Sequence, residues 1–224
     1  MASKADGGAR AALLGDVVGS RTADDRKALH DVLTAALAEV TAEVDALDDI
    51  QVTAGDEFQG TFATVGEAVY AALLLRLRLS TRIDIRVGIG WGDVTVLDAA
   101  RSTQDGPAWW AARAAIDWVE EQQGVAGFAS LRTAYRRAEE SEGRGRRGSG
   151  PAPDAINAAL LCQDHLMGFM DARSRHILEG LMHGRTQASL ADELGLTRQA
   201  VNQRRKHDGL AVVAMAAQSL RMVG

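Results

Sequence analysis

The stretch VTAGDEFQG, residues 52–60, places two adjacent carboxylates, Asp56 and Glu57, at a glycine-flanked turn. A further carboxylate, Asp16, interrupts the apolar run AALLGDVV. Burying a carboxylate is costly unless it has a partner or a cation. Carboxylates at neighbouring strand ends form an oxygen-rich site that suits Mg²⁺, which usually shares its coordination shell with substrate phosphates. We therefore expect a metal site at Asp16, Asp56 and Glu57; the alternative is that these carboxylates only shape a turn.

The segments around these carboxylates predict an α+β domain. The run at 11–18 reads as a strand, and the following segment has apolar residues at helical spacing, with Thr22 or Asp24 as its N-cap. Residues 49–63 predict two short strands that turn at Gly55 and Asp56. A second helix follows, capped by Thr64 with Glu67 completing a capping box, and residues 82–97 predict a second hairpin. This order favours helices on one face of a mainly antiparallel sheet.

Two glycine patterns bear on nucleotide binding. Gly19 follows the first strand, where backbone amides can approach a triphosphate ahead of a helix. Gly88, Gly90 and Gly92 spell GxGxG, but a dinucleotide-binding fingerprint must open a helix, and the next residues, DVTVL, continue as a strand. We expect a twisted or bulged hairpin there, at a subunit contact.

Composition limits the class of protein and indicates how the chain divides into domains. The chain has 224 residues, 46% of them hydrophobic, a net charge of -5, and one cysteine, Cys162. No apolar run reaches the ~20 residues that span a bilayer, so a cytoplasmic protein without disulfides is expected. Residues 139–154 are rich in glycine and poor in large apolar residues, which predicts a flexible linker between a domain at 1–138 and a domain at 155–224.

Four blocks of the first domain resemble known families. GDVVGSR, VTAGDEFQG, IRVGIGWGDV and DGPAWWAARAAI occur in this order over about residues 11 to 120. They resemble the SatD family and, more distantly, the catalytic core of class III nucleotide cyclases and the GGDEF domain. The resemblance implies a ferredoxin-like palm. It also implies Mg²⁺ and a purine nucleotide as ligands, held by Asp16, Val17, Gly19, Asp56 and Arg113, with Glu57 at an acidic position of the GGDEF hairpin.

The departures from the cyclase pattern affect the expected activity. Arg113 matches the arginine that stabilises the transition state, and it is the catalytic residue if the chain is an enzyme. Val52 stands where cyclases carry a base-selecting lysine, and Trp109 stands where they carry a transition-state asparagine. Because phosphoryl chemistry depends on positioned polar groups, this palm is not expected to be a competent cyclase. Trp109 and Trp110 either stack on a base or fill a core or dimer contact.

The second half resembles a DNA-reading module. The segment DARSRHILEGLMHG predicts a helix capped by Asp171. TQASLADELGLTRQAVNQRRKH, residues 186–207, then follows the helix-turn-helix pattern, with Gly195 at the turn and Thr186 and Thr197 as caps. Amide and guanidinium side chains on the second helix suit base edges. The predicted DNA-contacting residues are Thr197, Arg198, Gln199, Asn202, Gln203, Arg204 and Lys206. The apolar segment 210–223 is expected to pack in the core of this all-α domain or to form a homodimer.

Three functions follow from these patterns. The leading prediction is a transcriptional regulator that binds double-stranded DNA and carries a cyclase-like sensing or dimerising domain. The alternative is a Mg²⁺-dependent, nucleotide cyclase-like enzyme that acts on a nucleoside triphosphate. The third is an interaction protein in which Asp56 and Glu57 only shape a hairpin.

Overall fold

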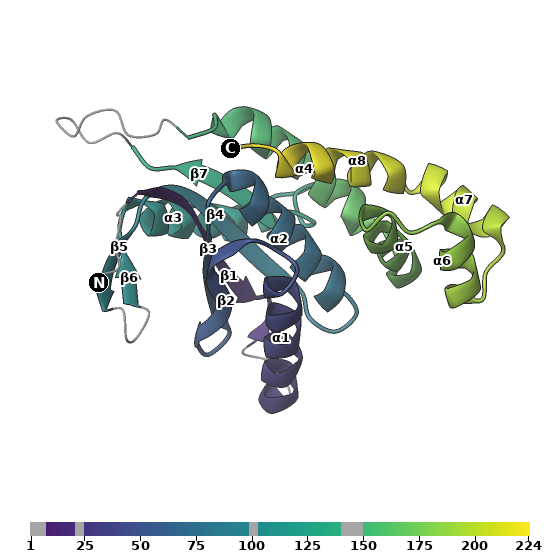
Figure 1. The fold of residues 1–224 in the computed structure, drawn as a ribbon, viewed down its shortest axis with the longest axis horizontal. Helices are drawn as coiled ribbons and strands as arrows, with labels where there is room; N and C mark the ends of the chain where they lie inside the picture. Colours follow the sequence, from purple (N-terminus) through teal and green to yellow (C-terminus); the bar gives the residue numbers. More distant parts are fainter. Residues whose placement is uncertain (1–7, 21–24, 99–102, 140–149) are drawn as a thin grey trace, which may run out of the picture.

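The computed structural model describes residues 8–20, 25–98, 103–139 and 150–224 (Figure 1). A five-stranded sheet lies at one end of the elongated molecule, and helices α5, α6 and α7 lie at the other (Figure 1). The elements in chain order are β1 (Ala9–Val17), α1 (Arg26–Thr41), β2 (Ala46–Ala54), β3 (Glu57–Phe62), α2 (Val65–Leu79), β4 (Ile85–Asp93), β5 (Thr95–Asp98), β6 (Thr103–Asp105), α3 (Pro107–Gln123), β7 (Thr133–Arg137), α4 (Pro153–Gly168), α5 (Ala172–Met182), α6 (Gln187–Leu194), α7 (Arg198–His207) and α8 (Leu210–Arg221). Within the described residues, no helix is both long enough and apolar enough to cross a membrane.

The sheet has the strand order β2-β3-β1-β4-β7. The first four of these strands pair antiparallel, and with α1 and α2 they form a β-α-β-β-α-β unit of the ferredoxin-like kind. Strand β7 extends the sheet by pairing parallel to β4. The predicted α+β class with a ferredoxin-like first part is therefore confirmed. The described part of β5 and β6 forms a separate two-stranded ribbon.

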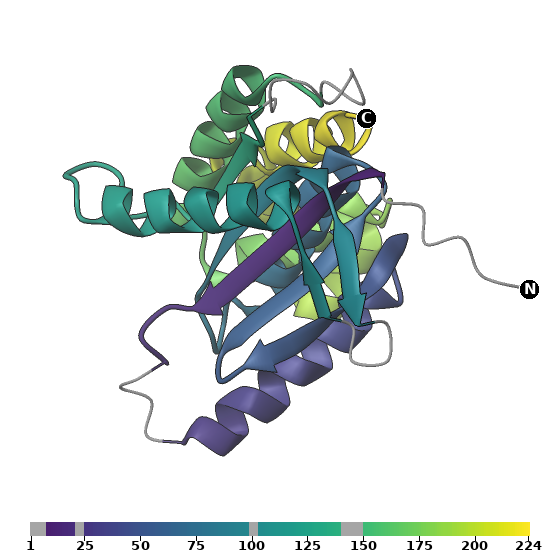
Figure 2. The same ribbon diagram turned by 90° about the vertical axis from the view of Figure 1, so that its left-hand side faces the viewer.

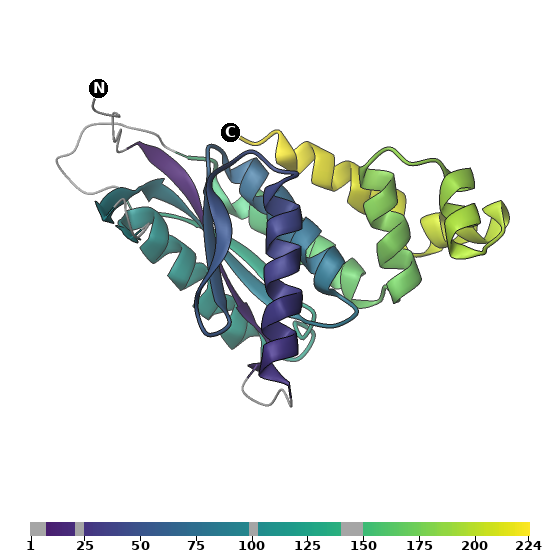
Figure 3. The ribbon, with the colours of Figure 1, turned by 60° about the horizontal axis from the view of Figure 1, so that its bottom comes forward.

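Helices cover both faces of the sheet. Successive side chains of β1 point to opposite faces: Ala11 and Leu13 pack in the core formed with α1 and α2, whereas Ala12 and Leu14 pack in a smaller core with α3. Figure 2 shows α3 crossing the sheet, and Figure 3 shows α1 and α2 on the other side. The prediction that the helices share one face is right for α1 and α2 and wrong for α3.

Strand β4 replaces the hairpin expected at 82–97. It runs unbroken as Ile85–Asp93 between β1 and β7, so its glycines are not a bend. A Cβ atom on Gly88 would lie 2.2 Å from the carbonyl oxygen of Ala112, and one on Gly90 would lie 2.0 Å from that of Ala108. The glycines are there because α3 lies directly against this strand, and the predicted hairpin is wrong.

Four of the predicted helix starts are confirmed by their caps. The side chains of Thr64, Asp171, Thr186 and Thr197 each accept a hydrogen bond from a backbone amide in the first turn. Helix α1 is capped by Asp25, whose carboxylate accepts from the amide of Ala28; the predicted caps Thr22 and Asp24 lie outside the described residues.

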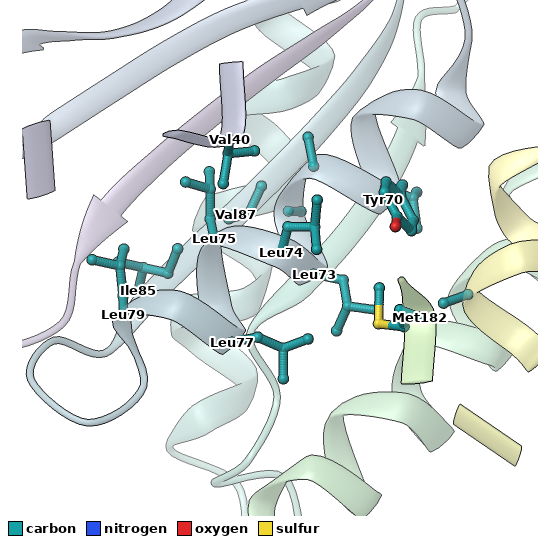
Figure 4. Close-up of a cluster of buried hydrophobic side chains, with 14 of the residues drawn as sticks. Val40, Tyr70, Leu73, Leu74, Leu75, Leu77, Leu79, Ile85, Val87 and Met182 are labelled. Atoms are coloured by element: carbon teal, nitrogen blue, oxygen red, sulfur yellow. The ribbon is translucent and has the colours of Figure 1, made fainter. Parts of the chain in front are cut away.

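The C-terminal helices pack on α2 and share its core. One cluster of buried apolar side chains runs from the sheet through α2 to α5 and α8, and Figure 4 shows Leu73 of α2 near Met182 of α5. At the other end of α2, the amide of Gly66 donates to the carbonyl oxygen of Val223 at 2.9 Å. The domain boundaries drawn at 138 and 155 stay a prediction. Most of the expected linker, residues 140–149, lies outside the described residues, and α4 begins at Pro153.

Side chains of α4 tie this helix to both α2 and β7. The fully buried carboxylate of Asp164 pairs with Arg76 and also accepts from the backbone amides of Arg132 and Thr133 at 2.7 and 2.8 Å. The side-chain amide of Asn157 donates to the carbonyl of Tyr135 and accepts from its amide, each at 2.9 Å. Since the buried polar groups of β7 are satisfied by α4, strand and helix depend on each other.

Candidate active site at the end of the sheet

Asp16 stands at the end of β1, on the face that α3 covers. Its register partner on β4 is Arg86, and the Nε and Nη2 atoms of Arg86 donate to the two carboxylate oxygens at 2.9 and 2.8 Å. The remaining Nη1 of Arg86 lies 2.8 Å from Oε1 of Glu120 on α3. Sequence reasoning expected a partner or a cation for Asp16, and the structure supplies an arginine.

The pKa of Asp16 is nevertheless raised. Burial is the largest cause, and the hydrogen bonds and charge of Arg86 only partly offset it. The negative charges of Glu120 and Asp56 raise the pKa further, which means that Asp56 lies close enough to act on Asp16. A second positive charge at this position would therefore relieve a repulsion that Arg86 alone does not cancel.

Asp56 and Glu57 occupy the turn between β2 and β3. Gly55 has a φ of 64°, a left-handed conformation that favours glycine. Glu57 begins β3, and its carboxylate accepts from both terminal nitrogens of Arg113 at 3.2 and 3.1 Å. Among the described residues, the Asp56 carboxylate has no hydrogen bond or ion pair, so it is available to a ligand.

The remaining predicted nucleotide-binding residues differ in accessibility. Val17 is 4% exposed and packs in the core, so its side chain faces away from the carboxylates. Gly19 has a φ of 72°, so the turn that leaves β1 requires a glycine. The prediction that Gly19 approaches a triphosphate stays a prediction.

The donor set fits a shared magnesium ion but not a closed metal cage. No group of three or more histidine, cysteine or acidic side chains in the described parts of the chain could hold a metal alone. Mg²⁺ is usually bound through one or two carboxylates plus waters and substrate phosphates, and Asp16 and Asp56 supply two. Glu57 as a third ligand stays a prediction, since here it pairs with Arg113.

The side chains at the two positions that depart from the cyclase pattern pack against apolar cores. Val52 pairs with Phe58 inside the β2–β3 hairpin. Trp109 packs against the small core under α3, and its Nε1 is buried with no partner in the described structure. Trp110 is 63% exposed and donates from Nε1 to Asp105 at 2.9 Å. Of the two tryptophans, Trp109 therefore serves as core, and Trp110 is the accessible one.

Two residues of the cluster, Arg86 and Glu120, were missed by sequence reasoning. The alternation in RIDIRV does contain a signal, because Ile83, Ile85 and Val87 are buried while Arg86 faces the other side. The partner of Arg86 depends on the register between β1 and β4, which no sequence pattern gave.

The predicted DNA-contacting residues lie on or next to α7. Gly195 between α6 and α7 has a φ of 62°, as expected for the turn, and Val201 is buried. Arg198, Gln199, Gln203 and Lys206 are exposed, and Asn202 is half-buried. Two of the predicted contacts already have structural roles: Thr197 caps α7, and Nη1 of Arg204 donates to both carboxylate oxygens of Asp171 at 2.8 Å and to Ser174.

The comparisons with known proteins follow this geometry. The sequence model of the SatD family matches residues 10–220, so the chain belongs to the SatD family. Solved structures to which this chain is similar include nucleotide cyclases. A bacterial light-regulated adenylyl cyclase has 11% identity and a TM-score of 0.46, covering 57% of this chain and 42% of that one. The guanylyl cyclase Cya2 has 14% identity and a TM-score of 0.42, covering 50% of this chain and 72% of that one.

A third similar structure is the guanylyl cyclase domain of the RhoGC fusion protein from the aquatic fungus Blastocladiella emersonii. It has 16% identity and a TM-score of 0.40, covering 50% of this chain and 75% of that one. This chain spans less than half the length of the light-regulated cyclases that it matches. The search of curated proteins gives no match.

The prediction of a DNA-binding transcriptional regulator is wrong. A single family match runs through both halves of the chain, so the C-terminal helices belong to the same family unit as the palm. The similar solved structures reported above are adenylyl and guanylyl cyclases. Helices α6 and α7 are joined by Gly195 in a left-handed conformation, and their assignment as a helix-turn-helix module stays a prediction.

Proposed function

We propose that this protein is a Mg²⁺-dependent enzyme that acts on the phosphates of a purine nucleoside triphosphate, with its site at the end of β1 and the beginning of β3 and β4. The observation that carries the proposal is the meeting of Asp16 and Asp56 with Arg86 and Arg113 on the face that α3 covers. Carboxylates for a cation beside arginines for phosphate oxygens are the parts that phosphoryl chemistry requires.

The electrostatics of Asp16 support this assignment. A carboxylate whose pKa is raised by burial and by the neighbouring charges of Asp56 and Glu120 gains from an added cation. A purely structural ion pair between Asp16 and Arg86 needs no Asp56 beside it. The positions of Asp16 and Asp56 in the sequence blocks also match the two metal-binding aspartates of the cyclase core.

In the proposed site, Asp16 and Asp56 hold Mg²⁺ together with the phosphates of the nucleotide. When bound, Mg²⁺ supplies positive charge to the phosphate oxygens and orients them. Arg113 lies on α3 and is 47% exposed at its side chain, so it can exchange Glu57 for a phosphate group. Bidentate contacts of this kind suit a guanidinium. Arg86 keeps Asp16 in place from the opposite side.

Cyclisation is expected to be slow if it occurs. Val52 offers no hydrogen bond to a base, and Trp109 is packed in the core rather than presenting an amide to the transition state. Removing one such polar group typically costs ~10²–10³ in rate. Hydrolysis of the triphosphate makes fewer demands on these two positions than attack by the ribose hydroxyl does.

The test is to incubate the purified chain with ATP, GTP or CTP and Mg²⁺ and to separate the products by anion-exchange chromatography. The chain is expected to convert a purine triphosphate to a cyclic nucleotide or a diphosphate, and to lose this conversion with EDTA. Binding of a non-hydrolysable analogue is followed by calorimetry, which detects the site even where turnover is slow.

Matched variants distinguish the loss of the binding site from the general effect of removing a negative charge. Asp56→Asn is expected to abolish Mg²⁺-dependent binding without unfolding the chain, because Asp56 has no structural partner among the described residues. Asp192→Asn removes an exposed carboxylate on α6 and should leave binding unchanged. If the wild type binds no triphosphate with Mg²⁺, or if Asp56→Asn binds it as well as the wild type, the proposal is wrong.

A further inference from the structure

A cavity of about 420 Å³ lies where the C-terminal helices meet the palm, and its lining does not include the residues of the Asp16 cluster. Its walls come from the end of α2 and the loop after it, the loop before β7, the end of α4, and α5 (Figure 1). This volume falls within the ~300–1,000 Å³ of typical small-molecule sites. The loop between α2 and β4 is also held to the residue that follows β1, because the backbone carbonyl of Asp84 accepts a hydrogen bond from the amide of Val18 at 2.9 Å.

Three guanidinium groups line this cavity: Arg76 from α2, Arg132 from the segment before β7, and Arg175 from α5. Arg76 is neutralised by the buried Asp164, and Arg132 donates to Asp84 from Nε at 2.9 Å and from Nη2 at 2.7 Å. No carboxylate pairs with Arg175 among the described residues. The cavity therefore carries one positive charge more than its carboxylates balance.

Arg175 is also incompletely hydrogen-bonded. Its Nη1 and Nη2 atoms donate to the carbonyl oxygens of Ser80 and Met167 at 3.3 and 3.2 Å, but its Nε is buried with no acceptor in the described structure. Burial lowers the pKa of Arg175, and the positive charge of Arg76 lowers it further. A buried donor without an acceptor is costly, so this guanidinium is prepared for an anion that the protein itself does not provide.

We infer that this cavity binds a small organic phosphate, with the phosphate group held by Arg175 and the other two guanidinium groups. Arginine forks pair with the oxygens of phosphate at short, charge-assisted distances. The hydroxyl of Ser130 is a further donor in the wall, and Ile83 and Met167 supply an apolar surface for the organic part. Because α5 contributes Arg175 and α2 contributes Arg76, such a ligand would join the C-terminal helices to the palm.

The experiment measures binding to the full chain by calorimetry and by the shift in melting temperature, in EDTA so that no Mg²⁺ site is formed. The probes are inorganic phosphate, ribose 5-phosphate and AMP, with ribose and adenosine as ligands lacking phosphate and malonate as a dicarboxylate. Saturable binding by the phosphate-bearing probes and none by ribose or adenosine is expected. Binding of malonate alone, or of no probe, overturns the inference.

Variants identify the site. Arg175→Gln is expected to weaken phosphate binding about tenfold or more, since it removes a hydrogen bond to a charged group. Arg173→Gln, an exposed arginine on the same helix, is the matched control and should bind like the wild type. If Arg175→Gln does not fold, Ala129→Glu places a carboxylate at the exposed rim and should weaken binding in the same way.

The outcome is distinguishable from that of the proposed function. Asp56→Asn should keep phosphate binding in the cavity, and Arg175→Gln should keep Mg²⁺-dependent triphosphate binding at the palm. Unchanged phosphate affinity in both Arg175→Gln and Ala129→Glu would show that the ligand binds elsewhere, and the inference would fail while the palm assignment stood.

Discussion

Arg86 and Asp16 face each other on neighbouring strands, and two nitrogens of the guanidinium donate to the two oxygens of the carboxylate at 2.9 and 2.8 Å. Burial raises the pKa of Asp16 despite this fork, and the neighbouring charges of Glu120 and Asp56 raise it further. A metal ion at this site therefore shares Asp16 with Arg86 rather than binding an unengaged carboxylate. Mutation of Arg86 is expected to shift the balance between its guanidinium and a metal ion at Asp16.

Arg86→Gln is expected to increase the stabilisation that Mg²⁺ gives. Without the guanidinium, like charges remain around Asp16, and a divalent cation relieves more repulsion than it does in the wild type. Melting temperatures with and without Mg²⁺ measure the effect, and a larger rise is expected for the variant. Arg82→Gln, in the exposed loop before β4, serves as the control. A rise no larger than that of the wild type would contradict Mg²⁺ binding at Asp16.

Asp164→Asn is expected to destabilise the fold strongly. The change leaves Arg76 buried without its counter-charge, and breaking a buried pair in this way costs ~3–5 kcal/mol. Urea denaturation followed by far-UV circular dichroism measures the free energy of unfolding. Asp154→Asn, on an exposed first-turn residue of the same helix, should change it by less than ~1 kcal/mol. Equal effects of the two substitutions would mean that the buried pair contributes nothing specific.

Gly90→Ala should weaken the packing of α3 on the sheet. The added methyl group would lie 2.0 Å from the carbonyl oxygen of Ala108, so the helix must move outward. Overpacking of this kind costs ~1–3 kcal/mol. Since α3 also carries Arg113, triphosphate affinity should fall with stability. Gly8→Ala, where nothing lies within 4 Å, is the control for thermal melting; a Gly90→Ala protein as stable as this control would refute the close approach.

Glu43→Gln tests the pH dependence of the contact that Glu43, in the loop after α1, makes with Arg78 on α2 and with His183 at the end of α5. Burial acts to raise the pKa of Glu43, but hydrogen bonds from His183 and Arg78 outweigh it and hold the pKa below its ordinary value of 4.5. When folding lowers the pKa of a carboxyl group, that group adds stability at pH values above its ordinary pKa. This stability is lost as the pH falls through the pKa of the folded state.

The free energy of unfolding of the wild type should therefore exceed that of Glu43→Gln by about 1 kcal/mol at pH 7, and this difference should shrink below pH 4.5. Chemical denaturation at a series of pH values measures it. Glu39→Gln removes an exposed carboxylate from α1, close to Glu43 in the sequence, and should show no such trend. A difference that grows toward low pH would have the wrong sign for this account.

Local patterns in the sequence predicted most of the elements but not how they meet. The caps at Thr64, Asp171, Thr186 and Thr197 and the turn at Gly55 were readable because each depends on a few neighbouring residues. The glycines of β4 led to the wrong prediction of a hairpin, because a bend and a close contact with a helix both favour residues without a side chain. Only the three-dimensional position of α3 decides between them.

Sequence reasoning named Asp16, Asp56, Glu57 and Arg113 for the candidate site but missed Arg86 and Glu120. Asp16 and Asp56 stood out as carboxylates next to apolar or glycine-rich segments. Arg86, Glu120 and the link between Glu57 and Arg113 depend on strand register and on which face α3 covers. Side chains brought together across 56 or 70 residues leave no periodic trace in the chain.

The pairing of Asn157 with both backbone groups of Tyr135 has a consequence for assembly. A side-chain amide occupies the place where a further strand would form its hydrogen bonds, so the outer border of the sheet at β7 is closed. Another polypeptide cannot extend the sheet there without first displacing α4 and exposing the charge of Asp164. Asn157 and Asp164 of α4 together therefore oppose self-association through this border, including the edge-to-edge aggregation to which open sheets are prone.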